Sequence, residues 1–136
     1  MEINDITYAI NGAAFEVNRI LGPGFLEKVY QNALLFELKE RGLKAKSQVP
    51  INVLYKENEV GEYFADILVE DNVIVELKTV EKLDKVHEAQ LLNYLKATSI
   101  KVGLLINYYH PKVEIKRIVL NLPEGHGGNH TAVLAV

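Results

Sequence analysis

The chain of 136 residues contains no cysteine. This absence excludes disulfides, zinc sites built on thiolates, iron–sulfur clusters and a cysteine nucleophile. No apolar run approaches the roughly 18 residues that a membrane-spanning helix needs. The acidic first ten residues, MEINDITYAI, also lack the basic and then apolar order of a signal peptide. We therefore expect a cytoplasmic protein that does not enter a membrane.

A strong charge of one sign is also missing, since 15 Lys and Arg residues face 18 Asp and Glu residues, for a net charge of -3. This net charge does not indicate a polyanionic partner. It does not exclude one either, because a local basic patch or a bound cation matters more for binding than the net charge. A hydrophobic content of 49% is typical of a folded globular chain. We expect residues 1–120 to form a single domain and the glycine-rich residues 121–136 to form a tail.

Helices are expected over residues 4–20, 25–41 and 84–97, where apolar residues recur at helical spacing. Asn4 or Asp5 is the expected N-cap of the first helix. Gly42 is expected to end the second, because glycine favours the position just past a helix end.

Strands are expected over residues 49–55, 62–69, 73–80, 102–107 and 113–120. The segment VGLLIN (102–107) is typical of a strand covered on both faces and parallel to the strand before the third helix. The order helix, helix, three strands, helix, two strands predicts an α/β fold with a mixed sheet flanked by helices.

Charged residues interrupt two of the predicted strands. Glu76 and Lys78 lie two residues apart in NVIVELKTV, so they point to the same face of the strand. Asp66 interrupts the preceding strand in the same way. A buried ion pair adds little stability, because desolvation offsets its Coulomb gain, and this favours a functional role. A structural ion-pair cluster is the alternative.

Carboxylates on neighbouring strands suit a hard divalent cation, and Mg²⁺ binds with one or two carboxylates, waters and a substrate phosphate. We predict that Asp66 and Glu76 bind Mg²⁺ or Mn²⁺ and that Lys78 orients a water or stabilises the phosphate. The two carboxylates share a face only if paired positions on the two strands sum to an even number, so we predict a three-residue loop, 70–72, or an equivalent bulge, which sets Asp66 opposite Glu76. Asn72 is the residue expected to take the left-handed conformation in that loop.

Several segments in order resemble the GxxExxY family of the PD-(D/E)XK nuclease superfamily: GFLEKVY, ADILVEDNVIVELKTV, HEAQLLNYL and VGLLIN. The resemblance covers about residues 5–120 and implies a restriction-endonuclease-like core. It implies that Asp66, Glu76 and Lys78 take the metal-binding and catalytic places, with Glu27 as a further acid from a helix. Tyr30, in the same motif as Glu27, is expected to pack in the core.

Gln90 and Tyr94 are similar to the QxxxY motif of the RecB-like branch of this superfamily. Residues four apart share one helix face, where an amide and a phenol can contact phosphate or hold Lys78. An ordinary helix flank is the alternative.

The resemblance implies a Mg²⁺-dependent nuclease that hydrolyses phosphodiester bonds of DNA or RNA, with Gln90 as a positioning residue. One alternative is a catalytically inactive nuclease-fold module that binds nucleic acid or protein. The acidic balance and the lack of an interleaved basic and aromatic stretch favour that alternative. Another is a structural homo-oligomer in which the tail, residues 121–136, exchanges between subunits.

Overall fold

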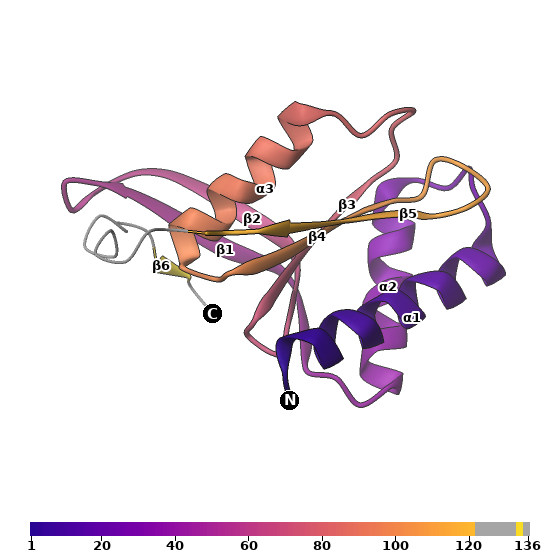
Figure 1. The fold of residues 1–136 in the computed structure, drawn as a ribbon. Coiled ribbons are helices and arrows are strands. Elements are labelled where there is room, and N and C mark those ends of the chain that lie inside the picture. Colours follow the sequence, from indigo (N-terminus) through magenta and orange to yellow (C-terminus); the bar gives the residue numbers. More distant parts are fainter. Residues whose placement is uncertain (122–132, 135–136) are drawn as a thin grey trace.

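The computed structural model describes residues 1–121 and 133–134 (Figure 1). The elements are α1 (Ile3–Leu21), α2 (Glu27–Glu40), β1 (Ala45–Tyr55), β2 (Asn58–Val69), β3 (Val73–Lys78), α3 (Lys85–Thr98), β4 (Val102–Asn107), β5 (Glu114–Val119) and β6 (Val133–Leu134). None of the helices in this described part is both long and apolar enough to cross a membrane.

The strands form one mixed sheet in the order β5-β4-β3-β2-β1-β6. β3 and β4 run parallel, and every other neighbouring pair is antiparallel. Helices α1 and α2 pack on one face of the sheet and α3 on the other (Figure 1). The central strands β3 and β4 are therefore covered on both faces, which explains their almost continuous apolar sequences. The predicted α/β fold is confirmed, and it is consistent with a restriction-endonuclease-like core.

The start of α1 differs from the sequence prediction. The N-cap of α1 is Glu2 rather than Asn4 or Asp5, and no side chain caps the helix. The helix begins earlier because Ile3 packs against the core, which places Asn4 and Asp5 inside the first turn. At α3 the expected start holds. Asp84 accepts a hydrogen bond from the backbone of Val86, and the His87 side chain accepts one from the backbone N–H of Asp84.

The loop between β2 and β3 has the predicted three residues, 70–72. Its ladder pairs Ile67 with Val75 and Val69 with Val73, and the same register sets Asp66 opposite Glu76. The prediction that Asn72 takes the left-handed conformation is wrong, because Glu70 (φ 53°) and Asp71 (φ 57°) take it instead.

Both left-handed residues of this loop are held by Lys44. The Glu70 carboxylate accepts a hydrogen bond from the backbone N–H of Lys44, and the Asp71 carboxylate accepts one from Lys44 Nζ. These contacts offset the steric cost of a positive φ at residues that have a Cβ atom.

Part of the region expected to be a tail contributes to the sheet. β6 pairs antiparallel with β1, with Leu134 opposite Ile51 and Val133 opposite Asn52. The other residues after 121 lie outside the described part of the chain.

The carboxyl ends of β3 and β4 are tied together by the buried side chain of Asn107. Its Nδ2 donates to the carbonyl of Val80 (2.8 Å) and to Glu114 Oε1 (2.9 Å), and its Oδ1 accepts from the backbone N–H of Val80 (3.0 Å). The backbone N–H of Tyr108 also donates to the carbonyl of Lys78 (3.0 Å). These bonds fix the strand end that carries Lys78.

We expect Asn107→Leu to lower the free energy of unfolding by about 2–3 kcal/mol, measured by urea denaturation. Leucine fills a similar volume but leaves the backbone N–H and C=O of Val80 without their partners. The matched control is Asn32→Leu at an exposed position of α2, which should change stability by about 0.5 kcal/mol or less. A loss no larger than that of the control would contradict the role given to Asn107.

Candidate active site

The candidate site lies where β2 and β3 separate. The last backbone pair of their ladder on this side is Ile67 with Val75. Beyond it, Glu76 Oε2 accepts a hydrogen bond from the backbone N–H of Asp66 (2.7 Å). Asp66 Oδ2 accepts one from the backbone N–H of Leu77 (2.8 Å). The two carboxylates thus accept the hydrogen bonds that backbone carbonyls would accept in a continuous ladder. The second oxygens, Asp66 Oδ1 and Glu76 Oε1, take no part in these two bonds.

The electrostatics of this pair disfavour two negative charges. Glu76 is only 5% exposed. Its burial, and next the charge of Asp66, raise its pKa to about 8, although the Asp66 N–H and Lys78 act in the opposite direction. The pKa of Asp66 is raised as well, by burial, against the lowering effects of the Leu77 N–H and of Lys78. A cation placed at this pair would relieve both effects.

Lys78 lies beside the carboxylates at the end of β3, and α3 reaches it through Gln90. Lys78 Nζ lies 3.4 Å from Gln90 Oε1, a long hydrogen bond between strand and helix. The structure therefore brings Gln90 to the lysine, one of the two contacts considered for it from the sequence.

Tyr94 lies one turn further along the same face of α3 and is buried. Burial first, and then the charges of Glu76 and Asp66, raise its pKa to about 12, while a hydrogen bond with Gln90 lowers it. The phenol is therefore neutral at physiological pH. Gln90 is in contact with both Tyr94 and Lys78, which connects α3 to the carboxylates.

Glu27 is the first residue of α2, the helix that packs on the sheet face opposite α3. Its side chain is exposed, yet partial desolvation and then the charge of Asp66 raise its pKa, and Lys78 lowers it. These effects place Glu27 within electrostatic reach of both Asp66 and Lys78.

The entry of α2 is held by Tyr30, which is a fully buried core residue, as expected. The Tyr30 hydroxyl donates to the carbonyl of Gly22 (2.6 Å) and accepts from the backbone N–H of Phe25 (3.1 Å). Its ring stacks on Tyr108 at 4.5 Å. Gly24 has φ 108°, a conformation that favours glycine. The glycine and the tyrosine of GxxExxY thus shape the loop from which Glu27 projects.

The sequence analysis did not identify two glutamines near Asp66. Gln48 contacts Asp66, and Gln31 contacts Gln48. Gln48 Nε2 donates to Gln31 Oε1 (2.7 Å) and lies 3.4 Å from Asp66 Oδ1. Gln48 sits at an irregularity of β1 with φ 51°, a feature that no local pattern predicts. Gln31 is buried, and its Nε2 has no partner among the described residues. The one sequence feature that could have identified Gln31 is its position, as a polar residue, within the apolar stripe of α2.

The donor set fits a hard divalent cation. The described residues hold no cluster of three or more Asp, Glu, His or Cys side chains that could ligate a metal. Two carboxylates nevertheless suffice for Mg²⁺, which keeps several waters and binds substrate phosphates. The observation of this structure that favours such a cation is the pairing of the buried Glu76 with Asp66, whose carboxylates bond to the backbone N–H groups of Asp66 and Leu77.

Comparison with known protein families agrees with this geometry. The model of the PD-(D/E)XK nuclease superfamily matches residues 4–118. The chain belongs to the PD-(D/E)XK nuclease superfamily. Nucleases of this superfamily typically use divalent metals. No curated protein and no solved structure matches the chain.

The raised pKa of Glu76 predicts how the metal-free protein responds to pH. The folded pKa, about 8, lies above the ordinary value of 4.5, so the folded state binds more protons than the unfolded state between these values. The contribution of this proton to stability is therefore greatest below pH 4.5 and is lost as the pH rises toward about 8. In EDTA we expect a slope of up to about 1.4 kcal/mol per pH unit from this proton.

Glu76→Gln is the matched variant, because its amide oxygen can still accept from Asp66 but the group does not titrate. We expect urea denaturation between about pH 5 and pH 8.5 to give a flatter stability profile for Glu76→Gln than for the wild type. Parallel profiles would mean that Glu76 is ionised in the folded protein without a penalty.

Divalent metal should stabilise the folded chain. Binding to the folded state alone raises the melting temperature by mass action, so we expect an increase with millimolar MgCl₂ or MnCl₂ in a thermal unfolding assay. Asp66→Asn should abolish this increase, whereas Asp5→Asn, in the exposed first turn of α1, should retain it. An equal increase in both variants would place the metal elsewhere.

Proposed function

We propose that this protein is a metal-dependent nuclease that hydrolyses phosphodiester bonds of DNA or RNA. The observation that carries the proposal is the exchange of hydrogen bonds between the Asp66 and Glu76 carboxylates and the opposite backbones, with Lys78 beside them. The buried Glu76 and the half-buried Asp66 both have a raised pKa, and this supports a site that binds a cation over a structural ion pair. Membership of the nuclease superfamily supports the same conclusion.

Each residue of the site has a role that follows from its contacts. Asp66 and Glu76 would hold Mg²⁺ or Mn²⁺ through the oxygens that their backbone hydrogen bonds leave. When bound, the cation lowers the pKa of a water and stabilises negative charge on the phosphoryl group. Lys78 orients that water or stabilises charge that develops on the phosphate oxygens.

Two residues support these groups from the helices. Gln90 keeps the Lys78 ammonium in place through the contact of 3.4 Å. Glu27 supports the metal or the lysine from the start of α2. We also assign the chain to the GxxExxY branch of the superfamily, on the loop that Gly24 and Tyr30 shape around Glu27. A cytoplasmic location stays a prediction from the sequence.

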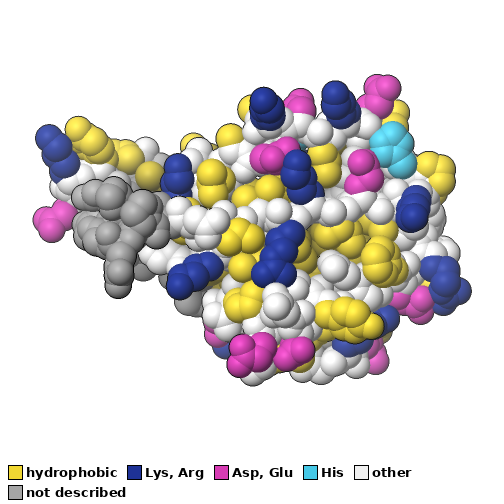
Figure 2. Space-filling view, viewed as in Figure 1, with side chains coloured by type: hydrophobic (Ala, Val, Ile, Leu, Met, Phe, Trp, Pro, Cys, Tyr) yellow, Lys and Arg dark blue, Asp and Glu magenta, His cyan; other side chains and the backbone are white. Residues whose placement is uncertain are grey.

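A catalytically inactive binding module is the second candidate, and exposed apolar side chains near the site favour it. Phe25 and Leu26 are 48% and 78% exposed just before Glu27, and Tyr109 is 48% exposed. Figure 2 shows Lys and Arg side chains interspersed with acidic ones on the visible face, without a continuous basic surface. A homo-oligomer that exchanges its tail is a further alternative, and it would pair β6 with β1 of another copy.

A nuclease assay with Lys78 variants tests the proposal. The lysine charge matters most when negative charge builds on the phosphoryl oxygens, so its loss should lower kcat more than substrate affinity. We expect Lys78→Ala and Lys78→Met to lower the rate by about 10²-fold or more. The assay measures cleavage of single- and double-stranded DNA and RNA with Mg²⁺ and with Mn²⁺.

Lys78→Met keeps the aliphatic stem, so it separates the charge from packing. Lys82→Met is the matched control, because Lys82 is exposed in the segment before α3, and it should cleave like the wild type. Equal rates for the wild type and Lys78→Met would remove Lys78 from the mechanism. Failure of the wild type to cleave any of these substrates would leave the binding module as the function.

A further inference from the structure

A groove of about 530 Å³ lies between α3 and the hairpin formed by β1 and β2. Val53 and Tyr63 line it from the hairpin, and Gln90, Asn93 and Tyr94 line it from α3. Gln90 and Tyr94 also belong to the candidate active site. The groove therefore borders the candidate active site, although neither Asp66 nor Glu76 lines it.

Tyr63 is the aromatic residue of the groove that no sequence motif includes. It pairs across the hairpin with Ile51, whose side chain belongs to the core cluster on the α3 face, so Tyr63 points toward α3. Its ring centroid lies 5.6 Å from that of Tyr94, at an angle of 44°. Tyr63 nevertheless remains 49% exposed, so a large part of the ring is open to a ligand.

The chemistry of the lining matches an unpaired nucleobase. A base offers a flat aromatic face, which stacks on tyrosine, and polar edges, which side-chain amides such as those of Gln90 and Asn93 can read. No acidic side chain is among the described residues that line the groove. In a duplex the faces of the bases are already stacked on one another and cannot meet Tyr63.

We propose that the protein takes a single strand of nucleic acid and stacks one of its unpaired bases on Tyr63, inside the groove. The proposal rests on the proposed nuclease function, because it assumes that the phosphodiester next to this base lies at Asp66 and Glu76. Tyr63 is then a determinant of substrate class, which selects unpaired strands over duplex.

Binding measurements on the full chain test this inference. The parent is Lys78→Met, which is expected to retain metal binding with little cleavage, in millimolar MgCl₂. The probes are a fluorescent oligothymidylate and a blunt duplex, followed by fluorescence anisotropy. Stacking of one base is worth about 1–3 kcal/mol, so adding Tyr63→Ala should weaken binding of the single strand about tenfold or more. The duplex should bind more weakly than the single strand, and its affinity should not change with Tyr63→Ala.

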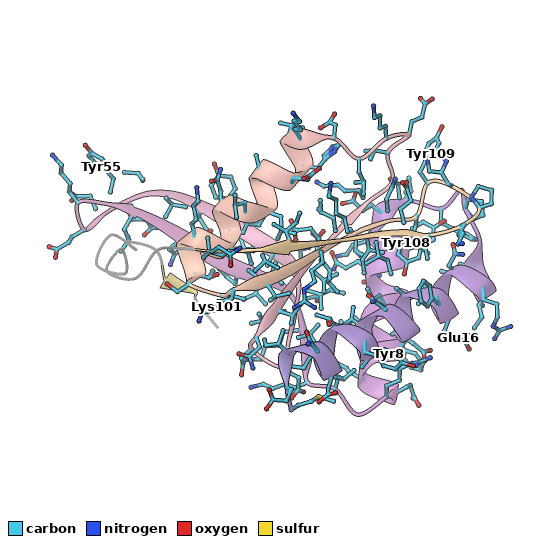
Figure 3. All side chains as sticks on the ribbon, in the orientation of Figure 1. Tyr8, Glu16, Tyr55, Lys101, Tyr108 and Tyr109 are labelled. Atoms are coloured by element: carbon cyan, nitrogen blue, oxygen red, sulfur yellow. The ribbon has the colours of Figure 1, made fainter. Side chains whose placement is uncertain are left out.

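Three further variants separate stacking from folding and from general aromatic effects. Tyr63→Phe keeps the ring and should bind the single strand within about twofold of the parent, whereas Tyr63→Leu should bind as weakly as Tyr63→Ala. Tyr8→Ala is the matched control, because Tyr8 is 81% exposed on α1, far from the hairpin tip marked by Tyr55 (Figure 3). An oligonucleotide that carries 5-iodouracil should crosslink under ultraviolet light to the peptide that contains Tyr63.

The outcomes distinguish this inference from the nuclease function. Unchanged binding by Tyr63→Ala, or a preference for the duplex, would overturn the base-stacking site even if the wild type cleaves nucleic acid. Binding that depends on Tyr63, in a wild type that cleaves nothing, would uphold the stacking site and overturn the nuclease function. Neither binding nor cleavage would overturn both.

Discussion

The exchange of hydrogen bonds between two carboxylates and two backbone N–H groups is the interaction on which the site depends. Where β2 and β3 separate, Glu76 accepts from Asp66 and Asp66 accepts from Leu77. A backbone N–H that loses its ladder partner inside a protein must find another acceptor, and here the acceptors are the acids themselves. The same geometry that completes the hydrogen bonding of the sheet therefore brings two negative groups together.

That arrangement imposes a cost, which the raised pKa values of Glu76 and Asp66 express. A fold selected only for stability would place apolar residues at these positions of a covered strand, since buried charges gain little after desolvation. The surrounding elements instead hold the pair in place. Asn107 ties the end of β3 to β4, α3 reaches Lys78 through Gln90, and Tyr30 shapes the start of α2. The polar contacts of all three converge on one edge of the central strands.

The two sides of the sheet contribute different residues to the candidate site. The α2 side carries an acid, Glu27, at the start of a helix whose preceding loop is held by Tyr30 and Gly24. The α3 side supplies the amide of Gln90 and, through Tyr94 and Tyr63, an aromatic groove next to the acids.

Local patterns in the sequence determined the α/β order and the shared face of Glu76 and Lys78. The three-residue loop was predicted from the requirement that Asp66 and Glu76 share a face. Side chains alternate between the two faces of a strand, and the number of residues in a hairpin loop sets which residues lie opposite each other. Both rules involve only residues close together in the sequence. Only the tertiary structure decided the start of α1 at Ile3, the left-handed Glu70 and Asp71, the contact of Gln48 with Asp66 and the approach of Tyr63 to Tyr94. Each of these depends on packing or hydrogen bonds between residues that are distant in sequence. A pattern of neighbouring residues does not show which distant residues will come into contact.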